Sequence, residues 1–339
     1  LLEEMISRDA ISRFPDPAFK LKQFSSYDRG SVSPEEEGWY ANEDYTRFLG
    51  IDSTHNRREF ILFDHIGAGT IVRWWMTFAG EGSYDGLIRV YLDGSDKAFI
   101  EDSVLKVLSG HLLTGEPLSS SVSPESDYHM RGHNLYMPIP YSEGCRITYE
   151  CYSIRLNGER WTQSIYYNIN YRDYEEGTEV ETLSMDQLVR SKTLLNRVNE
   201  TLISASDKII PGSEPSEMIK PGASLSKTIN KGGSAISKLD VKIYAEHLGQ
   251  ALRSTVLEIN FDDTRTVWVP LGDFFATGFE LKESRTWYSS VDSDTTLSCR
   301  WIMPFKNNAR VSILNLGRQD VRASLSITLE DYKWDRGSM

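Results

Sequence analysis

Short apolar strands dominate the chain, and they fall into two sets separated by one clear helix. From Glu59 onward, runs rich in Val, Ile, Tyr, Phe and Trp alternate with polar positions and are separated by Gly, Asp and Ser turns. Such runs are typical of a β-sandwich or jelly roll rather than of βαβ units. A second set of the same kind extends from Ser234 to Tyr332. The pattern therefore predicts an all-β protein.

Two stretches have helical rather than strand periodicity. Residues 1–14 carry apolar side chains at broadly helical spacing and are followed by two prolines, which predicts a short N-terminal helix. Residues 184–203 repeat Leu and Val at helical spacing, with Ser184 as a candidate N-cap and Gln187 three residues later. We predict that this helix connects the two strand sets and that a Pro/Gly-rich linker follows it.

The second strand set repeats the first. GAGTI (67–71) lines up with GGSAI (232–236), an offset of 165 (232 − 67). PYSEGCRIT (140–148) lines up with PFKNNARVS (304–312), an offset of 164 (304 − 140). In both halves, an alternating strand between these anchors ends in an acidic turn. Matching offsets at both ends of a segment indicate an internal duplication.

We therefore predict two tandem jelly-roll β-sandwiches related by duplication. Residues 1–183 would hold the N-terminal helix, a long irregular segment (Phe24–Phe48) and the first jelly roll. Residues 184–230 would form the connecting helix and linker, and residues 231–339 the second jelly roll. A chain of 339 residues is long enough for two domains of ordinary size. An irregular segment as long as Phe24–Phe48 is uncommon in a compact domain unless it has a function.

Composition and charge exclude several classes of function. The net charge is −12 and no Lys/Arg block occurs, so the average field would repel nucleic acids and anionic membrane surfaces. No window approaches 18 consecutive apolar residues, so no membrane insertion is expected. Cys145, Cys151 and Cys299 cannot all pair and lack metal-ligand spacing, so we expect buried thiols. His129 and His133 have no third ligand nearby, so we expect no metal and no cofactor.

Several motifs, in the right order, resemble the DUF2961 family, now grouped with glycoside hydrolase family 172. They are the duplicated GxGxI strand, the phrases RVYLDG, YMPIPY and PLGDFF, and the early SSYDR, and they extend over Phe24–Tyr332. The resemblance implies tandem jelly rolls that assemble into homotrimers or hexamers. It also implies action on furanose-containing oligosaccharides or polysaccharides, such as fructofuranosides or arabinofuranosides. In the family, the pocket lies in the second jelly roll near a subunit boundary, and two acidic side chains carry a retaining mechanism.

The resemblance also favours a periplasmic or secreted location. The chain begins at Leu1 without a charged and then apolar leader. We therefore expect that any secretory signal was removed or never existed.

The early segment matches the family well. Tyr27, Asp28 and Arg29 lie in SSYDR, and Asn42 and Asp44 look like the family's N-D-D element after a longer spacer. Asp and Asn accept hydrogen bonds from vicinal hydroxyls, and Arg donates to sugar oxygens, so these residues suit a sugar pocket. Alternatively, Asp28 and Arg29 form an ion pair that only holds the loop.

The catalytic motif matches poorly. Many relatives have T-E-D-Y-F where this chain reads LGDFF (271–275), so Gly272 stands where a carboxylate is expected. Retaining hydrolysis needs two carboxyl groups about 5 to 5.5 Å apart. Five acids lie within 22 residues of each other: Asp273, Glu280, Glu283, Asp292 and Asp294. Asp273 has apolar flanks that favour a partly desolvated, proton-donating acid, although a turn aspartate after a strand is the alternative.

These residues lead to one main hypothesis and two alternatives. We predict a retaining, furanosidase-like glycoside hydrolase that uses Asp273 with Glu280 or Glu283, and Trp287 and Tyr288 as flat surfaces for a sugar ring. A non-catalytic glycan-binding or scaffold protein is the alternative, and the glycine in LGDFF supports it. A purely structural, capsid-like assembly shares the fold, but the polar aromatic loops exceed what a shell needs.

Overall fold

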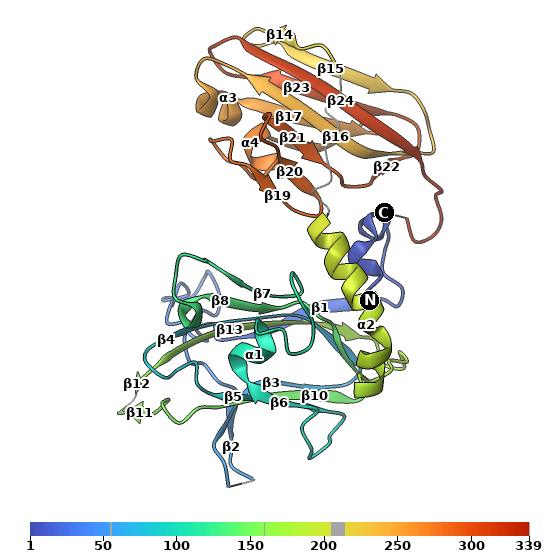
Figure 1. Cartoon of the computed structure of the whole chain (residues 1–339). Helices are drawn as coiled ribbons and strands as arrows, with labels where there is room; N and C mark the ends of the chain where they lie inside the picture. The colour runs from blue at the N-terminus through green and yellow to red at the C-terminus, as the bar shows by residue number, and fades with distance from the viewer. Residues whose placement is uncertain (55, 159, 205–213, 339) are drawn as a thin grey trace. The chain divides into compact units, whose positions relative to one another are not determined.

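The chain folds into two compact β units, which are described separately. The computed structural model describes residues 1–54, 56–158, 160–204 and 214–338. The first unit comprises Leu1–Glu3 and Asp16–Glu200, and the second comprises Glu4–Pro15 and Thr201–Met339 (Figure 1).

The first unit is a sandwich of two antiparallel sheets, with strand orders β1-β13-β4-β8-β7 (β9 also pairs with β4) and β2-β3-β10-β5-β6. Phe63 of β3 packs against Phe24 of β1 and Tyr171 of β13, with ring centroids 4.8 and 5.1 Å apart, so the core lies between the sheets. The strands are β1 (Phe19–Ser25), β2 (Gly50–Asp52), β3 (Glu59–Ile66), β4 (Gly69–Ala79), β5 (Leu87–Leu92), β6 (Ile100–Ser103), β7 (Ser119–Val122), β8 (Gly132–Leu135), β9 (Ile139–Tyr141), β10 (Gly144–Glu150) and β13 (Ser164–Tyr174), with a hairpin of β11 (Leu156–Asn157) and β12 (Arg160–Trp161). The helices are α1 (Val104–Leu108), η3 (Tyr128–Met130) and α2 (Met185–Ser204).

The second unit is a sandwich of the same kind, with strand orders β14-β24-β16-β21-β20-β19 (β22 also pairs with β16) and β15-β23-β17-β18. The strands are β14 (Glu217–Ile219), β15 (Ser224–Ile229), β16 (Ser234–Tyr244), β17 (Thr255–Phe261), β18 (Thr264–Pro270), β19 (Ser284–Arg285), β20 (Ser289–Val291), β21 (Thr296–Cys299), β22 (Met303–Phe305), β23 (Ala309–Asn315) and β24 (Val321–Asp331). The helices are η1 (Glu4–Ile6), η2 (Arg8–Ser12), α3 (Leu248–Ser254) and α4 (Leu271–Phe274).

The two units have the same jelly-roll topology. The sheet β1-β13-β4-β8 corresponds to β14-β24-β16-β21, and β3-β10-β5-β6 corresponds to β15-β23-β17-β18. The repeated motifs occupy equivalent places, because β4 and β16 begin 165 residues apart and β9 and β22 each pair with the first residues of these strands. The predicted duplication and tandem jelly rolls are therefore confirmed.

The repeated acidic turn has a structural role in both units. Asp93 accepts hydrogen bonds from the backbone amides of residues 142–144, and Asp262 does the same for residues 306–308, at 2.6 to 3.2 Å. Burial opposes ionisation, but the hydrogen bonds that each carboxylate accepts lower the pKa of both groups. An equivalent aspartate thus stabilises the equivalent turn in each unit.

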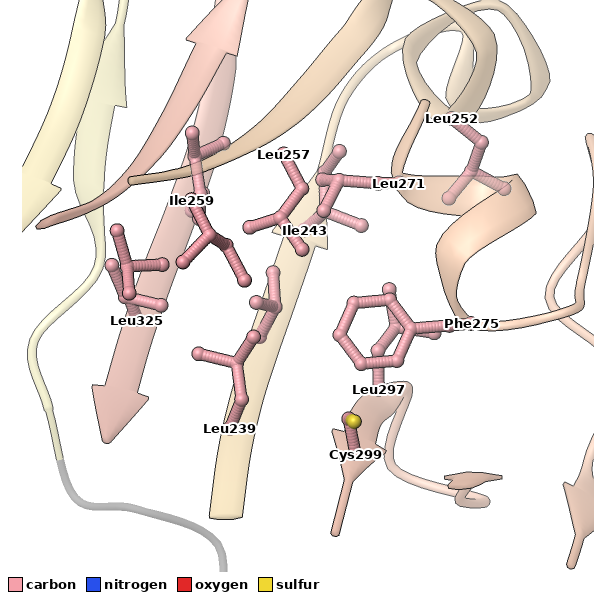
Figure 2. Close-up of a cluster of buried hydrophobic side chains, with 14 of the residues drawn as sticks. Leu239, Ile243, Leu252, Leu257, Ile259, Leu271, Phe275, Leu297, Cys299 and Leu325 are labelled. Carbon is pink, nitrogen blue, oxygen red and sulfur yellow. The ribbon is translucent and has the colours of Figure 1, made fainter. Parts of the chain in front are cut away.

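The core of the second unit is formed by the apolar side chains that alternate with polar ones along its strands. Figure 2 shows Leu239 and Ile243 of β16 directed toward Leu257 and Ile259 of β17, in the opposite sheet. Neighbouring positions of a strand face opposite sides of its sheet. The polar residues of β16 that alternate with these apolar residues therefore point to the outer face of the sheet.

The connecting helix begins as predicted. The Ser184 hydroxyl accepts from the Gln187 amide at 3.2 Å, and the Gln187 side chain accepts from the Ser184 amide at 2.8 Å, which is a capping box. The helix is α2, and Asn199 near its end anchors it to the first unit through hydrogen bonds with Leu118 and Thr114.

Two predictions about the flanking segments need correction. The N-terminal helix is divided into η1 and η2 because Ser7 between them is extended, and a stretch this short cannot sustain an α-helix cooperatively. These turns belong to the second unit rather than the first. The predicted linker contains β14 and β15, which pair with β24 and β23, so the second sandwich begins before residue 231. Residues 205–213 of that linker lie outside the described residues.

The cysteine prediction is confirmed, because Cys145, Cys151 and Cys299 are all buried free thiols. Among the described residues, no helix is long and apolar enough to cross a membrane.

Candidate functional site

The residues that the sequence nominated for a sugar site divide between the two units. Tyr27, Asp28, Arg29, Asn42 and Asp44 belong to the first unit. Asp273, Glu280, Glu283, Trp287 and Tyr288 belong to the second unit. Each group is therefore considered within its own unit.

In the first unit, Asp28 organises the irregular segment. Its carboxylate is buried and accepts hydrogen bonds from the amides of Gly30 and Glu43, both at 3.0 Å. These hydrogen bonds lower the pKa of Asp28. The Asp28 amide in turn donates to Asp44 at 2.7 Å. Asp28 and Asp44 therefore hold two distant parts of the segment together.

The cation beside Asp28 is not the one considered from the sequence. The guanidinium of Arg47 lies 3.4 Å from Asp28, whereas Arg29 lies over the Tyr27 ring, 4.3 Å from its centroid. Tyr27, Arg29 and Asn42 are exposed. The segment thus presents an aromatic ring, a guanidinium and an amide to solvent on a fixed backbone.

In the second unit, the three acids predicted to be catalytic lie in solvated, ion-paired positions. Asp273 is on α4 with its side chain 40% exposed and forms an ion pair with Arg253, so the predicted desolvation is wrong. The reason is the orientation of this turn: Leu271 and Phe275 point into the core (Figure 2). The Asp273 side chain remains 40% exposed. Glu280 and Glu283 are exposed and pair with Lys282 and Arg285, respectively.

Packing explains the glycine that precedes Asp273. A Cβ atom at Gly272 would clash with the carbonyl oxygen of Gly278 and lie 2.7 Å from its carbon. The amides of Thr277 and Gly278 both donate to the Gly272 carbonyl oxygen at 2.8 Å. A carboxylate therefore cannot be accommodated at Gly272 without rebuilding this turn.

The outer face of the β24-β16-β21-β20 sheet carries a polar cluster that the sequence analysis missed. Asp240 lies on this face because its neighbours in β16, Leu239 and Val241, point into the core. It is nonetheless buried, accepts from the Ser298 hydroxyl at 2.7 Å and pairs with Lys238 at 2.7 Å. A buried, paired carboxylate on the outer face of a sheet marks a covered polar site rather than open surface.

Asp292, just after β20, is the second carboxylate of this cluster. Its side chain is only 14% exposed, and its nearest cation is Arg285, 3.8 Å away. Burial raises the pKa of Asp292, the positive charges of Arg285 and Arg300 oppose that rise, and the negative charges of Asp294 and Asp240 reinforce it. Asp292 and Asp240 therefore lie within electrostatic range of each other in unlike surroundings.

Five buried polar atoms between residues 287 and 300 lack a hydrogen-bond partner within the part of the chain that the structure describes. They are Trp287 Nε1, Ser290 Oγ, Asp292 Oδ2, Thr295 Oγ1 and Arg300 Nη1. A buried polar group without a partner costs about 1 to 3 kcal/mol. Each such atom needs an explanation, and a bound water or polar ligand is one of them.

Trp287 and Tyr288 adjoin this cluster, but Trp287 is not a free platform. The Arg8 guanidinium from η2 lies 3.8 Å above the Trp287 ring and donates to its carbonyl oxygen at 3.1 and 3.3 Å. Burial raises the pKa of Tyr288, and its carbonyl oxygen accepts from the Arg300 amide at 2.7 Å. Burial and the charge of Arg300 lower the pKa of Arg8. The cluster thus combines two carboxylates, three guanidinium groups and two aromatic rings.

Asp292 was counted among the acids of its segment, but nothing in the sequence distinguished it from its neighbours. Asp240 could have been noticed in the sequence, because it is an acidic residue within a strand whose alternation places it on the outer face. Their burial depends on strands that are distant in the sequence, so only the structure could select them.

Other polar features have structural roles. His133 is buried against the Ser109 hydroxyl at 2.6 Å, and burial lowers its pKa to about 4. A cavity of about 670 Å³ opens on the first unit, but Asp52 and Asp64 on its wall pair with Arg146, and Asp93 fixes the turn already described. No group of three or more His, Cys, Asp or Glu side chains that could hold a metal occurs among the described residues.

Comparison with known proteins identifies both units. A model described as the GH172 first β-sandwich domain matches residues 17–191, and one described as GH172 domain-like matches residues 212–328. A search of curated proteins found no match.

Among solved structures, the chain is similar to the major capsid protein P2 from bacteriophage PM2, with 9% identity, coverage of 94% of this chain and 100% of that chain, and a TM-score of 0.25. It is also similar to the mavirus major capsid protein, with 10% identity, coverage of 94% and 88%, and a TM-score of 0.19. TM-scores this low carry no functional argument.

Proposed function

Because this chain belongs to the GH172 family, and is thus a carbohydrate-active protein of glycoside-hydrolase type, we propose that it is a retaining, furanosidase-like hydrolase. Its substrate would be a furanose-containing oligosaccharide or polysaccharide. We also propose that it acts as a homotrimer or hexamer outside the cytoplasm, as the family resemblance implies.

The buried, unlike pair of Asp292 and Asp240 carries this proposal. A retaining enzyme needs one carboxyl group that is protonated near neutral pH and one that is ionised. Burial raises the pKa of Asp292, whereas Asp240 forms an ion pair with Lys238 and accepts a hydrogen bond from the Ser298 hydroxyl. We assign Asp292 as the general acid and Asp240 as the nucleophile.

The chemistry then follows the double-displacement scheme. Asp240 would attack the anomeric carbon while Asp292 donates its proton to the leaving oxygen, so that the glycosidic bond breaks and a glycosyl ester forms. Asp292, now ionised, would take a proton from the water that attacks the ester and releases the sugar. Arg300, which has a buried donor without a partner, would bind a sugar oxygen.

The pair proposed from the sequence remains a competitor. Asp273 with Glu280 or Glu283 would also supply two carboxyl groups, but each is solvated and each forms an ion pair with a basic side chain. The exposed residues Tyr27, Arg29 and Asn42 remain candidates for sugar contact, with Asp28 and Asp44 holding their segment. Trp287 and Tyr288 would contact substrate through their edges.

Turnover of aryl furanosides distinguishes the two pairs. We expect Asp292→Asn to lower kcat/KM, which reports formation of the glycosyl ester, by about 10²- to 10⁴-fold on a substrate with a poor leaving group, but much less with a dinitrophenyl leaving group, which needs no acid. Asp240→Asn should abolish turnover of both substrates, because no glycosyl ester can form without the nucleophile. Glu246→Gln, on an exposed turn of the same unit, is the control.

The opposite result would reassign the pair. Full activity in Asp292→Asn and Asp240→Asn, together with loss in Asp273→Asn, would move the chemistry to the sequence-based pair. The binding or scaffold alternative would gain support if the folded protein bound furanosides but turned over none of them. The glycine at 272 no longer favours that alternative, because packing accounts for it.

A further inference from the structure

The second unit presents another functional surface on its other sheet, β15-β23-β17-β18. Leu257 and Ile259 of β17 point into the core, so Glu258 and Asn260 face outward. Trp268 of β18 lies directly opposite Glu258 in the strand pairing. We call this outer face, with Glu258, Asn260, Arg265, Trp268 and Arg310, the β18 face.

The duplicated fold provides an internal comparison for this face. Arg89 is the counterpart of Glu258 in the first unit. Arg89 pairs with Thr148 of β10, and Glu258 pairs with Ser312 at the equivalent position of β23. In the first unit this place is closed, since Arg89 is 3% exposed and forms ion pairs with Glu59, Glu101 and Glu150. Three carboxylates surround this one buried guanidinium, so no positive charge is left over for an anionic ligand.

In the second unit the equivalent place is open. Trp268 stands where the first unit has Glu101, and it is 47% exposed even though Arg265 lies over its ring, 4.8 Å from the centroid. Arg265 and Arg310 approach opposite oxygens of Glu258 at 3.9 and 3.7 Å, which is too long for hydrogen bonds. Both arginine side chains are more than half exposed, so both remain accessible to a ligand from solvent.

We propose that the β18 face binds an acidic saccharide, with the sugar ring on Trp268 and its carboxylate on Arg265 and Arg310. An exposed indole offers a flat apolar surface to the C–H groups of a sugar ring. A guanidinium group binds a carboxylate through two parallel hydrogen bonds, which a neutral sugar cannot form. Two arginines against one glutamate make this face locally positive on a chain whose net charge is −12.

Glu258 has a defined role in this proposal. Its side chain accepts from Asn260 at 3.1 Å and lies between the two guanidinium groups, so it positions both of them. It also competes with the ligand carboxylate for their charge. Glu258→Gln keeps the acceptor for Asn260 and removes that competition, so this variant should bind an acidic sugar more tightly.

Calorimetric titration of the full chain tests the proposal directly. The probe is tetragalacturonic acid, and its fully methyl-esterified form is the matched neutral compound. We expect only the acid to bind. Each of Arg265→Gln, Arg310→Gln and Trp268→Ala should raise its Kd at least about tenfold, which corresponds to about 1.4 kcal/mol of binding free energy. Trp39→Ala, which removes a similarly exposed tryptophan, should bind as the wild type does.

Three outcomes would overturn the proposal. Equal binding of the acid and its ester would remove the arginines from recognition, and unchanged affinity in Trp268→Ala would remove the ring. A Trp268→Ala variant whose oligomeric mass falls in sedimentation would make the face a contact between copies of this chain. Binding does not depend on catalysis, so Asp292→Asn should retain it whether or not that residue proves catalytic.

Discussion

Replacing Gly272 with alanine tests whether packing selects glycine at this position. The new Cβ would clash with the Gly278 carbonyl oxygen and lie 2.7 Å from its carbon, and both atoms are backbone. The turn cannot open freely, because the amides of Thr277 and Gly278 both donate to the Gly272 carbonyl oxygen. Overpacking costs about 1 to 3 kcal/mol and each lost hydrogen bond about 1 kcal/mol. We therefore expect the free energy of unfolding to fall by about 3 to 5 kcal/mol.

Urea and thermal unfolding of the full chain, followed by tryptophan fluorescence, measure this loss. In a unit of roughly 150 residues, 1 kcal/mol corresponds to a change in Tm of about 3 °C, so the transition of the second unit should fall by about 10 °C or more. Gly278→Ala is the matched control. Its φ is +67° and no described atom lies within 4 Å of the new Cβ, so it should cost only the about 1 to 2 kcal/mol of a left-handed alanine.

The reasoning is refuted if Gly272→Ala unfolds within about 0.5 kcal/mol of the wild type, the range of an ordinary surface substitution. It is also refuted if the two alanine variants lose the same stability. In either case a side chain would fit at this position. Gly272→Glu would then become a fair attempt to install a carboxylate and should be assayed for a gain in furanoside turnover.

Three further predictions concern the pH profile and two structural caps. Arg285→Gln removes a positive charge that lowers the pKa of Asp292, so the high-pH limb of kcat/KM should move to higher pH; an unmoved limb would contradict Asp292 as the acid. Asp262→Asn should lower the free energy of unfolding at neutral pH. In urea unfolding, the gap between variant and wild type should shrink below about pH 4. The reason is that a carboxylate with a lowered pKa loses its stabilising effect as the pH falls through the pKa of the folded state. Asp93→Asn should show the same trend, and opposite trends would argue against equivalent turns. Ser184→Ala should cost about 1 kcal/mol and speed hydrogen exchange in the first turn of α2, while unchanged exchange would mean that the cap does not hold the helix end.

The fold could be predicted because its signals are local and repeated. Alternation within each strand, the two matching offsets and the Ser184–Gln187 cap all act within a few residues or recur at a fixed distance. The N-terminal helix and the linker were the exceptions. Their outcome depended on contacts with distant elements, such as the pairing of β14 with β24.

The site was harder to predict because desolvation depends on the whole fold. Asp273 has apolar neighbours in sequence, yet α4 turns those neighbours inward and leaves the carboxylate in solvent. Asp292 is followed by polar residues in the sequence, yet the fold buries it near Asp240 and Arg300. The sequence therefore ranked the acids of this segment in the wrong order of burial.

The amino-acid sequence alone thus determined two copies of one jelly roll, since strand period and repeat offset are properties of the chain read in order. Only the tertiary structure decided which carboxylates lose water and which glycine has no room for a side chain. The physical reason is that the pKa of a buried acid and the space around a Cβ are set by atoms brought close by folding, whatever their separation in sequence.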